Sequence, residues 1–351
     1  MLIKKILKIV LPKKFYFCIA GHNTFKKNWF LRFWAALHGF TIDEWVIFEF
    51  PKNNYRDYIS EYDRFNFRNV ALKYRIVFDN KMLFYHLMKD IAPLNRLYAH
   101  KDFGKYSAQS DDFMIDNLLE TLKQVKKIVY KPIVAGGGGR GFALIEYNEG
   151  NYYINRKSIP SSEIVDMLIS TDNYMLEEYC FQSEFENNIF PDTVNTLRII
   201  TVEEKNTIQV VVVMQRLGSV KDSCADNASL GGLFCSVDIE TGILSAAFSY
   251  SPDFLFDNLG QKQVFPTHPT TNNRLEGLVI PNFDYIKSEA CRIHEAIRFT
   301  GAKFVAWDFA LTEDGYRVIE GNTSSGMKFI QFHEGMKNKP LGKWMKNNFF
   351  I

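Results

Sequence analysis

The chain has 351 residues, enough for two or three compact lobes with a large buried core. Its hydrophobic fraction of 46% and charged fraction of 23% are ordinary for a soluble globular protein. The formal net charge is only +2 and the lysines are dispersed, so we expect no nucleic-acid partner. An odd number of cysteines without a CxxC pair indicates reduced thiols rather than a disulfide framework or a zinc site: Cys18, Cys180, Cys224, Cys235 and Cys291.

The first 21 residues mix five lysines with Leu, Ile, Val and Phe. No apolar run in the chain is long enough to span a membrane, and the segment lacks the uninterrupted hydrophobic region and cleavage site of a signal peptide. Two interpretations stay open. We favour a solvated first helix that leads into a core strand; the alternative is a basic amphipathic segment resting on an anionic membrane surface. We therefore expect a cytoplasmic protein, in the second case at the inner face of the membrane.

Helical spacing at Phe30, Phe33, Trp34 and Leu37 predicts a mainly helical N-terminal lobe, residues 1–78. Further along, the apolar pattern alternates between helical and strand periods, and the whole chain is predicted to be α+β. We predict helices over residues 80–89, 111–126, 161–170 and 285–300. We predict strands over residues 127–132, 142–147, 174–180, 196–202, 208–215, 233–237, 304–311 and 317–320, with a long functional loop over 250–280.

A glycine-rich loop separates the strands over 127–132 and 142–147. Consecutive glycines let the backbone approach an anion and point several N–H groups at it. A dinucleotide fingerprint would need a helix next, and a Walker loop would need Lys-Ser or Lys-Thr after its last glycine; neither is present. We interpret the loop as a flap over a triphosphate, with Lys131 on the incoming strand; the alternative is a flexible hairpin tip. The flap residues are Gly136, Gly137, Gly138, Gly139, Arg140 and Gly141.

Asp308, Glu320 and Asn322 are polar residues on two otherwise apolar strands joined by a tight Asp-Gly turn. Glu320 and Asn322 share a strand face, and the turn brings Asp308 alongside them. Two carboxylates and an amide oxygen suit Mg²⁺ that bridges phosphate oxygens. The alternative is a pair of solvated acids at the strand ends.

Arg198 and Arg216 fall near the open end of the predicted hairpin of strands 196–202 and 208–215. We expect them to act catalytically by stabilising charge on a transferring phosphoryl group or an acyl phosphate, although either arginine alone also fits a surface strand end. His268, in the long loop, would orient substrate or, as we favour, serve as an ordinary loop histidine. The other histidines have no metal-site spacing.

Taken together, these motifs resemble the ATP-grasp superfamily, and within it the sugar-transfer associated ATP-grasp proteins of bacterial polysaccharide gene clusters. The resemblance rests on an ordered set of phrases that spans residues 80–330. They are Asn80-Lys81, Tyr130-Lys-Pro-Ile-Val-Ala-Gly-Gly-Gly-Gly-Arg-Gly141, Met175-Leu-Glu-Glu-Tyr179, Phe190-Pro-Asp-Thr-Val-Asn-Thr-Leu-Arg-Ile-Ile-Thr201, Gly231-Gly232, Asp238-Ile-Glu-Thr-Gly242, Ala306-Trp-Asp-Phe-Ala310 and Val318-Ile-Glu-Gly-Asn322.

The resemblance implies an ATP-grasp fold, in which two α+β lobes clamp ATP. The nucleotide-binding lobe with the flap would cover residues 79–185, and the C-terminal lobe with the metal site residues 186–351. Lys81 and Lys131 resemble the lysines at the nucleotide phosphates, and Glu177 the acid at the adenine amino group. The remaining nucleotide contacts implied are Met175 as an apolar wall, the backbone of Glu178 and Cys180 at the hinge, and Glu184 at the ribose.

The metal ligands of the family match Asp308, Glu320 and Asn322, which implies ATP and Mg²⁺ as cofactors. One departure concerns charge. D-alanine:D-alanine ligases, which the tail of this motif also resembles, carry an arginine two residues before the metal aspartate, where this chain has Ala306. Arg198 or Arg216 would have to supply that charge.

The activity implied is a carboxylate–amine ligase. A substrate carboxylate attacks the γ-phosphate, and an amine then displaces phosphate from the acyl phosphate. We expect it to modify a cell-surface polysaccharide or its precursor, with a small or sugar-linked carboxylate and an amine as partners. Two alternatives stay open: a phosphotransferase acting on a sugar hydroxyl, and a non-catalytic nucleotide-binding partner of a glycosyltransferase. The sequence names neither the substrates nor the oligomeric state, and the N-terminal lobe is a candidate for acceptor specificity by its position alone.

Overall fold

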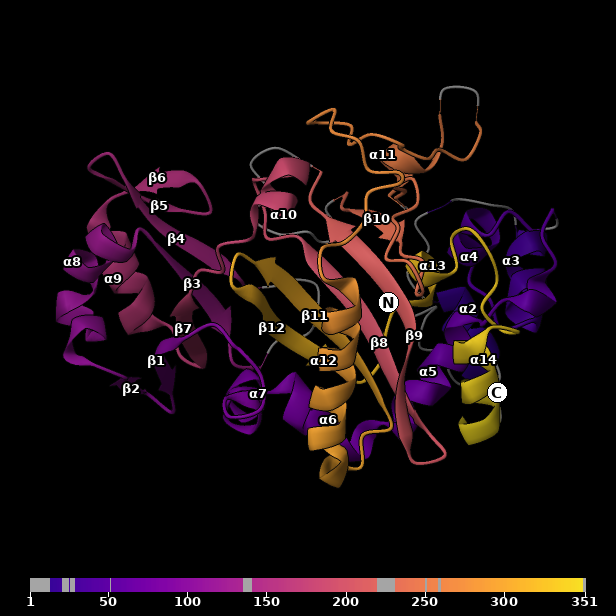
Figure 1. Ribbon diagram of the computed structural model, residues 1–351, viewed down its shortest axis with the longest axis horizontal. Helices are drawn as coiled ribbons and strands as arrows, with labels where there is room; N and C mark the ends of the chain where they lie inside the picture. Colours follow the sequence, from indigo (N-terminus) through magenta and orange to yellow (C-terminus); the bar gives the residue numbers. More distant parts are fainter. Residues whose placement is uncertain are drawn as a thin grey trace.

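The computed structural model describes residues 13–20, 25, 29–50, 52–134, 141–219, 231–249, 251–257 and 260–349. The basic segment over residues 1–12, on which the membrane interpretation partly rests, lies outside this part of the chain, as does Cys224. Two antiparallel sheets dominate the molecule, one at each end of the row of strands seen in Figure 1, and a group of N-terminal helices lies beyond the second sheet.

The first sheet has seven strands in the order β2-β1-β7-β3-β4-β5-β6. Each neighbouring pair is antiparallel, and β7 is inserted between β1 and β3 although it follows them in the chain. The strands are β1 (Leu97–Asp102), β2 (Lys105–Ala108), β3 (Lys127–Pro132), β4 (Ala143–Asn148), β5 (Asn151–Ile154), β6 (Lys157–Ile159) and β7 (Tyr174–Glu178).

Two helices, α8 (Ile115–Val125) and α9 (Ser161–Ser170), cover one face of the first sheet. Leu118 and Leu122 lie one turn apart on α8 and are buried, so they present a single apolar stripe to the strands. They join a cluster that includes Ile128 of β3 and Ile164 of α9. A single 3₁₀ turn, Asp111–Phe113, precedes α8.

The second sheet has five strands in the order β10-β9-β8-β11-β12, all antiparallel. The long hairpin of β8 and β9 lies beside β11, so strands from both ends of the C-terminal half share this sheet (Figure 1). The strands are β8 (Thr196–Glu204), β9 (Thr207–Leu217), β10 (Leu233–Ser236), β11 (Phe304–Thr312) and β12 (Gly315–Asn322).

The helix α12 (Phe283–Ala296) packs on one face of the second sheet, where Ile286 and Ile293 meet Val213 and Trp307. A 3₁₀ turn, Arg298–Thr300, follows it. Two helices, α6 (Leu72–Asp79) and α7 (Lys81–Met88), lead from the N-terminal region to the first sheet. Both pack against β12 at the edge of the second sheet. Short helices α10 (Glu184–Ile189) and α11 (Pro252–Leu255) lie in the connections.

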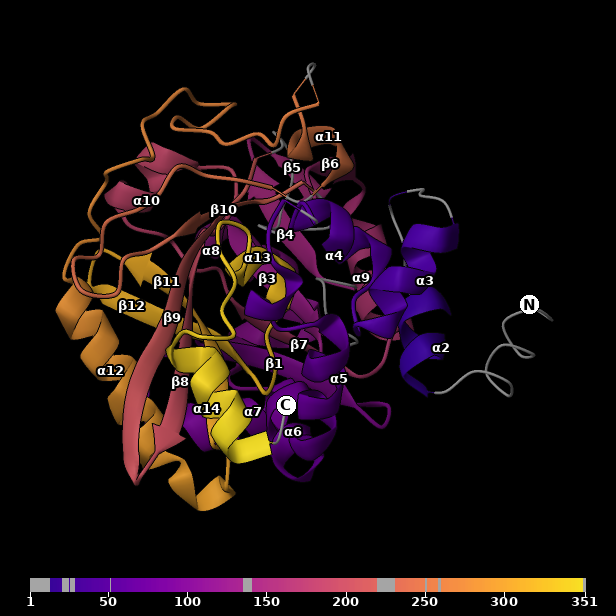
Figure 2. The ribbon, with the colours of Figure 1, turned by 90° about the vertical axis from the view of Figure 1, so that its right-hand side faces the viewer.

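The opposite face of the second sheet is covered by N-terminal and C-terminal segments together (Figure 2). Phe67 contacts both Phe304 of β11 and Trp344 near the C-terminus, so the three aromatic rings form one core. Buried Gln331 accepts a hydrogen bond from the Ile59 N–H at 2.7 Å and donates one to the Ile59 carbonyl at 2.9 Å. The helices here are α2 (Lys13–Ala20), α3 (Trp29–Leu37), α4 (Ile42–Ile47), α5 (Glu61–Val70), α13 (Met327–Ile330) and α14 (Pro340–Phe349), with a 3₁₀ turn at Tyr55–Asp57.

The structure confirms the α+β class and most predicted elements. Helix 285–300 begins two residues earlier than predicted and its last turn is 3₁₀, while strand 317–320 extends to 315–322 at both ends. The hairpins β1–β2 and β5–β6 were not predicted, nor were α10, α13 and α14. The core strand expected after the first helix is not found, because the described residues contain only helices before β1. The division into lobes at residues 79 and 186 stays a prediction.

A chain of buried hydrogen bonds joins α12 to the second sheet. The Trp307 indole N–H donates to Thr201 Oγ1 at 2.8 Å, and this hydroxyl donates to His294 Nδ1 at 2.8 Å. His294 Nε2 in turn donates to the Ala302 carbonyl at 2.8 Å, so in the neutral ring Nδ1 is the nitrogen that accepts from Thr201. Burial lowers the pKa of His294 from its usual value of 6.5.

This neutral histidine predicts a loss of stability in mild acid. The unfolded chain takes up a proton at His294 near pH 6.5 and the folded chain only at lower pH, so the free energy of unfolding falls as the pH drops below 6.5. The slope from this group reaches at most about 1.4 kcal/mol per pH unit. Urea unfolding between pH 7.5 and pH 5.5 should show a shallower decline in His294→Gln than in the wild type. Equal declines would contradict the prediction.

Candidate active site

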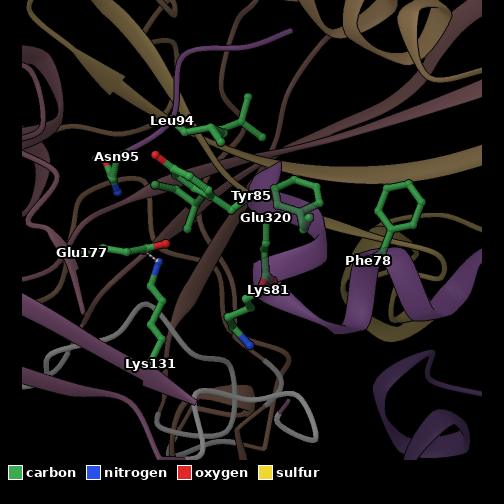
Figure 3. A pocket seen from close by; sticks show the side chains of 11 residues that line it. Phe78, Lys81, Tyr85, Leu94, Asn95, Lys131, Glu177 and Glu320 are labelled. Atoms are coloured by element: carbon green, nitrogen blue, oxygen red, sulfur yellow. Dashed lines mark hydrogen bonds and ion pairs between the residues drawn. The ribbon is translucent and has the colours of Figure 1, made fainter. Parts of the chain in front are cut away.

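A cleft lies between α7, the strands β3 and β7 of the first sheet, and β12 of the second. Its empty volume is about 470 Å³, part of it open to solvent. Charged side chains from four different elements line it: Lys81, Lys131, Glu177 and Glu320 (Figure 3). The cleft therefore joins the two sheets and combines two cations with two carboxylates.

Lys131 and Glu177 form an ion pair in the cleft wall (Figure 3). Their strands are antiparallel neighbours, with Lys131 opposite Met175, so Glu177 lies two residues along on the same face. Lys131 Nζ is 2.5 Å from Glu177 Oε2, and the two side chains are 13% and 11% exposed. The lysine charge is thus already held at one side of the cleft.

Lys81 is fixed by the start of α7. Asn80 caps this helix through a 3.0 Å hydrogen bond from the Leu83 N–H to its side-chain oxygen. The Lys81 N–H donates to the Ile133 carbonyl at 2.9 Å, which ties the helix to the end of β3. Burial lowers the pKa of Lys81, and the nearby Glu320 carboxylate opposes that shift. The Glu320 carboxylate on β12 is therefore near enough to favour the charged form of Lys81.

Beside the cleft, two arginines converge on Asp308. Strand register sets Asp308 of β11 opposite Arg198 of β8 and opposite Glu320 of β12. Arg198 donates through Nε to Asp308 Oδ1 and through Nη2 to Oδ2 at 2.9 Å, and Arg216 Nη1 donates to Oδ2 at 2.8 Å. Arg198 also donates to Ser325 Oγ at 3.1 Å. Bidentate pairing of this kind fixes the planes of the groups as well as their distance.

The two carboxylates of this cluster titrate in opposite directions. Burial alone would raise the pKa of Asp308, but the Arg198 and Arg216 guanidiniums outweigh it and hold the pKa at about 2. Burial raises the pKa of Glu320, and the charge of Asp308 and a hydrogen bond between the two acids add to the shift. Asp308 is therefore an anion, and Glu320 holds a shared proton more readily than an ordinary glutamate.

The donor set at this position fits a hard divalent cation. Asp308, Glu320 and Asn322 come from adjacent strands, and the Asn322 amide lies 3.1 Å from Glu320 Oε1. Gly321 separates the last two ligands; a Cβ there would lie 2.9 Å from the Phe78 ring and 3.1 Å from the Phe84 ring, so glycine lets α6 and α7 pack on β12. The described residues contain no cluster of three or more His, Cys, Asp or Glu that could hold a metal, so a cation here would depend on phosphate oxygens and water for the rest of its shell.

A family model described as sugar-transfer associated ATP-grasp matches residues 60–343. The chain belongs to this ATP-grasp family. The match confirms the resemblance drawn from the ordered motifs and the ATP-grasp fold that it implied.

Solved ATP-grasp structures are similar at low identity. The ligase PsnB with minimal precursor, Mg and ADP has 12% identity and a TM-score of 0.37, covering 76% of this chain and 57% of that chain. N5-carboxyaminoimidazole synthetase from Staphylococcus aureus with ADP has 12% identity and a TM-score of 0.39, covering 72% of this chain and 46% of that chain. D-alanine–D-alanine ligase from Bacillus anthracis has 11% identity and a TM-score of 0.37, covering 76% of this chain and 61% of that chain. This chain therefore spans less than two thirds of the length of each of the three structures. No curated protein matches the sequence.

The other residues predicted to contact the nucleotide either do not line the cleft or lie outside the described residues. The Glu178 N–H donates a hydrogen bond to the Arg96 carbonyl at 2.9 Å. Met175 is fully buried. Cys180 is buried, which raises its pKa to about 12. Glu184 is exposed at the start of α10 and does not line the cleft. Of the flap, Gly141 is described, with φ of +78° and space only for hydrogen beside Pro132; Gly136, Gly137, Gly138, Gly139 and Arg140 lie outside the described residues.

Several cleft residues were missed from the sequence. Tyr85 and Asn95 both line the cleft and are labelled in Figure 3. Tyr85 lies four residues after Lys81 on the same helix face, a spacing that could have indicated it. Asn95 follows a turn and carried no recognisable pattern. His268, in contrast, is fully buried, stacks on Phe190 and holds the Gly218 carbonyl at 2.8 Å, so it organises the long loop.

No helix in the described residues is both long and apolar enough to cross a bilayer.

The ion pair in the cleft wall predicts a strong coupling. Lys131→Met leaves the buried Glu177 carboxylate without its cation. We expect this substitution to lower the free energy of unfolding by about 3 kcal/mol. The double variant Lys131→Met/Glu177→Gln should recover part of that loss in urea unfolding. Lys123→Met removes a matched lysine from an exposed pair with Glu120 and should leave the free energy of unfolding nearly unchanged. A loss at Lys131 as small as that of the control would contradict the coupling.

Proposed function

We propose that this protein is an ATP- and Mg²⁺-dependent carboxylate–amine ligase that acts through an acyl phosphate. The observation that carries the proposal is the position of Glu320, which lines the cleft with Lys81 and lies opposite Asp308 on the neighbouring strand. A nucleotide in the cleft would therefore have its phosphates next to a carboxylate pair and two arginines. Family membership supports ATP as the nucleotide.

In this proposal Lys81 and Lys131 bind the phosphates, since they are the two cations of the cleft. Glu177 accepts a hydrogen bond from the adenine amino group through the carboxylate oxygen that the lysine does not hold, and Met175 backs the base. The backbone of Glu178 and Cys180 would face the base edge. Glu177 and Met175 are buried and held by the pairing of β7 with β3, which supports recognition of a rigid planar ring.

Mg²⁺ would be held by Asp308, Glu320 and Asn322, and when bound it would neutralise charge on the phosphate oxygens. Arg198 and Arg216 are pre-oriented by Asp308, so their remaining N–H groups can stabilise the oxygens of the transferring phosphoryl group. A substrate carboxylate oxygen attacks the γ-phosphorus and ADP leaves with the bond electrons. The amine then attacks the acyl carbon, and phosphate departs.

The substrate class follows from the family description alone. A sugar-transfer associated family supports a carboxylate or an amine carried by a cell-surface polysaccharide or its cytoplasmic precursor.

We predict that ADP, phosphate and a condensed product appear together when the protein is incubated with ATP, Mg²⁺ and a panel of uronic acids and amino acids. Mass spectrometry identifies the product. Asp308→Asn and Arg216→Met should each lower the turnover number about a hundredfold or more, because both remove fixed charge next to the phosphates.

Asp314→Asn, in the surface turn between β11 and β12, is the matched control and should keep wild-type turnover. A phosphorylated sugar in place of a condensed product would overturn the ligase in favour of a phosphotransferase. Nucleotide binding with no turnover on any member of the panel would favour a non-catalytic role.

A further inference from the structure

Four large apolar side chains project from one face of α3 into solvent. Trp29, Phe30, Phe33 and Leu37, here called the α3 patch, are 67%, 75%, 51% and 46% exposed. Their spacing of four residues from Trp29 to Phe33 to Leu37 puts them on one stripe, while Ala35 and Ala36 on the other side of the helix are fully buried. The helix therefore has two apolar faces; one is buried in the fold, and the other is largely exposed in the described part of the chain.

The α3 patch lies far from the nucleotide cleft. Figure 1 shows α3 at the end of the long axis opposite α8 and α9. Phe15 of α2 contacts Phe33 with ring centroids 5.3 Å apart, and Lys14 donates from Nζ to the Leu37 carbonyl at 2.9 Å. The patch thus continues onto α2 and is bordered by a lysine.

The sequence that leads into the patch and forms it is basic. Residues 1–42 contain eight Lys or Arg and no Asp or Glu, whereas the other 309 residues contain 34 basic and 40 acidic side chains. Arg32 lies over the Trp29 ring at 5.2 Å. Within the described part of the chain Arg32 has no carboxylate partner, and its buried Nε has no acceptor. Arg32 and Lys14 lie at the border of this exposed apolar face, and two cations there are complementary to an anionic surface.

Other exposed aromatic residues are not clustered as those of the α3 patch are. Phe103, at the β1–β2 turn, is 94% exposed and Phe299 is 77% exposed, but each stands singly in its segment. Single exposed apolar residues need no partner, and clustered ones do. Association of two α3 patches would bring the basic ends of two copies together, which like-charge repulsion opposes.

We propose that the α3 patch binds an anionic lipid surface, with Trp29, Phe30 and Phe33 among the headgroups and Arg32 and Lys14 at lipid phosphates. Tryptophan and phenylalanine with flanking cations are typical of helices that lie in the membrane interface. The surface is separate from the cleft, so this inference stands whether or not the ligase proposal is correct.

The test uses the full-length protein with vesicles of phosphatidylcholine, alone or mixed with phosphatidylglycerol. We expect co-sedimentation only with the anionic vesicles, weakened by salt. Phe30→Ser/Phe33→Ser should lower the partition coefficient between vesicle and water at least about tenfold, because it removes two of the three rings proposed to enter the lipid headgroup region. The matched control Phe103→Ser/Phe299→Ser should bind as the wild type does. Thermal unfolding of both variants checks that they are folded, and the exposed positions predict little change.

No binding of the wild type to anionic vesicles would overturn the proposal. Binding that is unchanged in Phe30→Ser/Phe33→Ser would also overturn it, because the attraction would then come from charge elsewhere in residues 1–42. Light scattering gives the third outcome: a wild-type dimer that the variant converts to a monomer would show that a second copy covers the α3 patch.

Discussion

Asp308 is only 2% exposed in the middle of β11, where an isolated carboxylate would be strongly unfavourable. Two arginines from β8 and β9 satisfy it, and in return its charge fixes their guanidinium planes. The third neighbour, Glu320, is protonated more readily because of that same charge, and it reaches into the cleft. A single buried anion thus fixes the two guanidinium groups and favours the protonated form of Glu320 beside the cleft.

The N-terminal helices border this cluster. Alternation along β8 puts Arg198 on the same face as Ile200, which belongs to the apolar cluster shared with the N-terminal and C-terminal helices. The Arg198 guanidinium lies 5.8 Å from the ring centroid of Phe329 on α13. The preceding residue on this helix, Lys328, pairs with Asp43 of α4. The region predicted as a separate lobe therefore packs against α13, which in turn contacts Arg198.

The sequence predicted which candidate site residues lie together better than it predicted the outer fold. Strand periods and the Asp-Gly turn correctly aligned Asp308 with Glu320, and the hairpin of β8 and β9 brought Arg198 and Arg216 together as expected. It could not show that both arginines bind the metal-ligand candidate itself, because that pairing depends on the order of strands in the sheet. The strand β1, over Leu97–Asp102, has polar residues in its second half, and its pairing with β7 spans distant parts of the chain, so no local pattern indicated it.

The measurement that tests the central role of Asp308 most directly is calorimetric titration with ADP, with and without Mg²⁺. We expect the wild type to bind ADP more tightly when Mg²⁺ is present. Asp308→Asn should lose this metal-dependent gain and keep the metal-free affinity, since Lys81 and Lys131 are untouched. Asp314→Asn should behave as the wild type. If Asp308→Asn retained the full gain from Mg²⁺, Asp308 would be an anchor for arginines alone, and the metal would have to bind elsewhere.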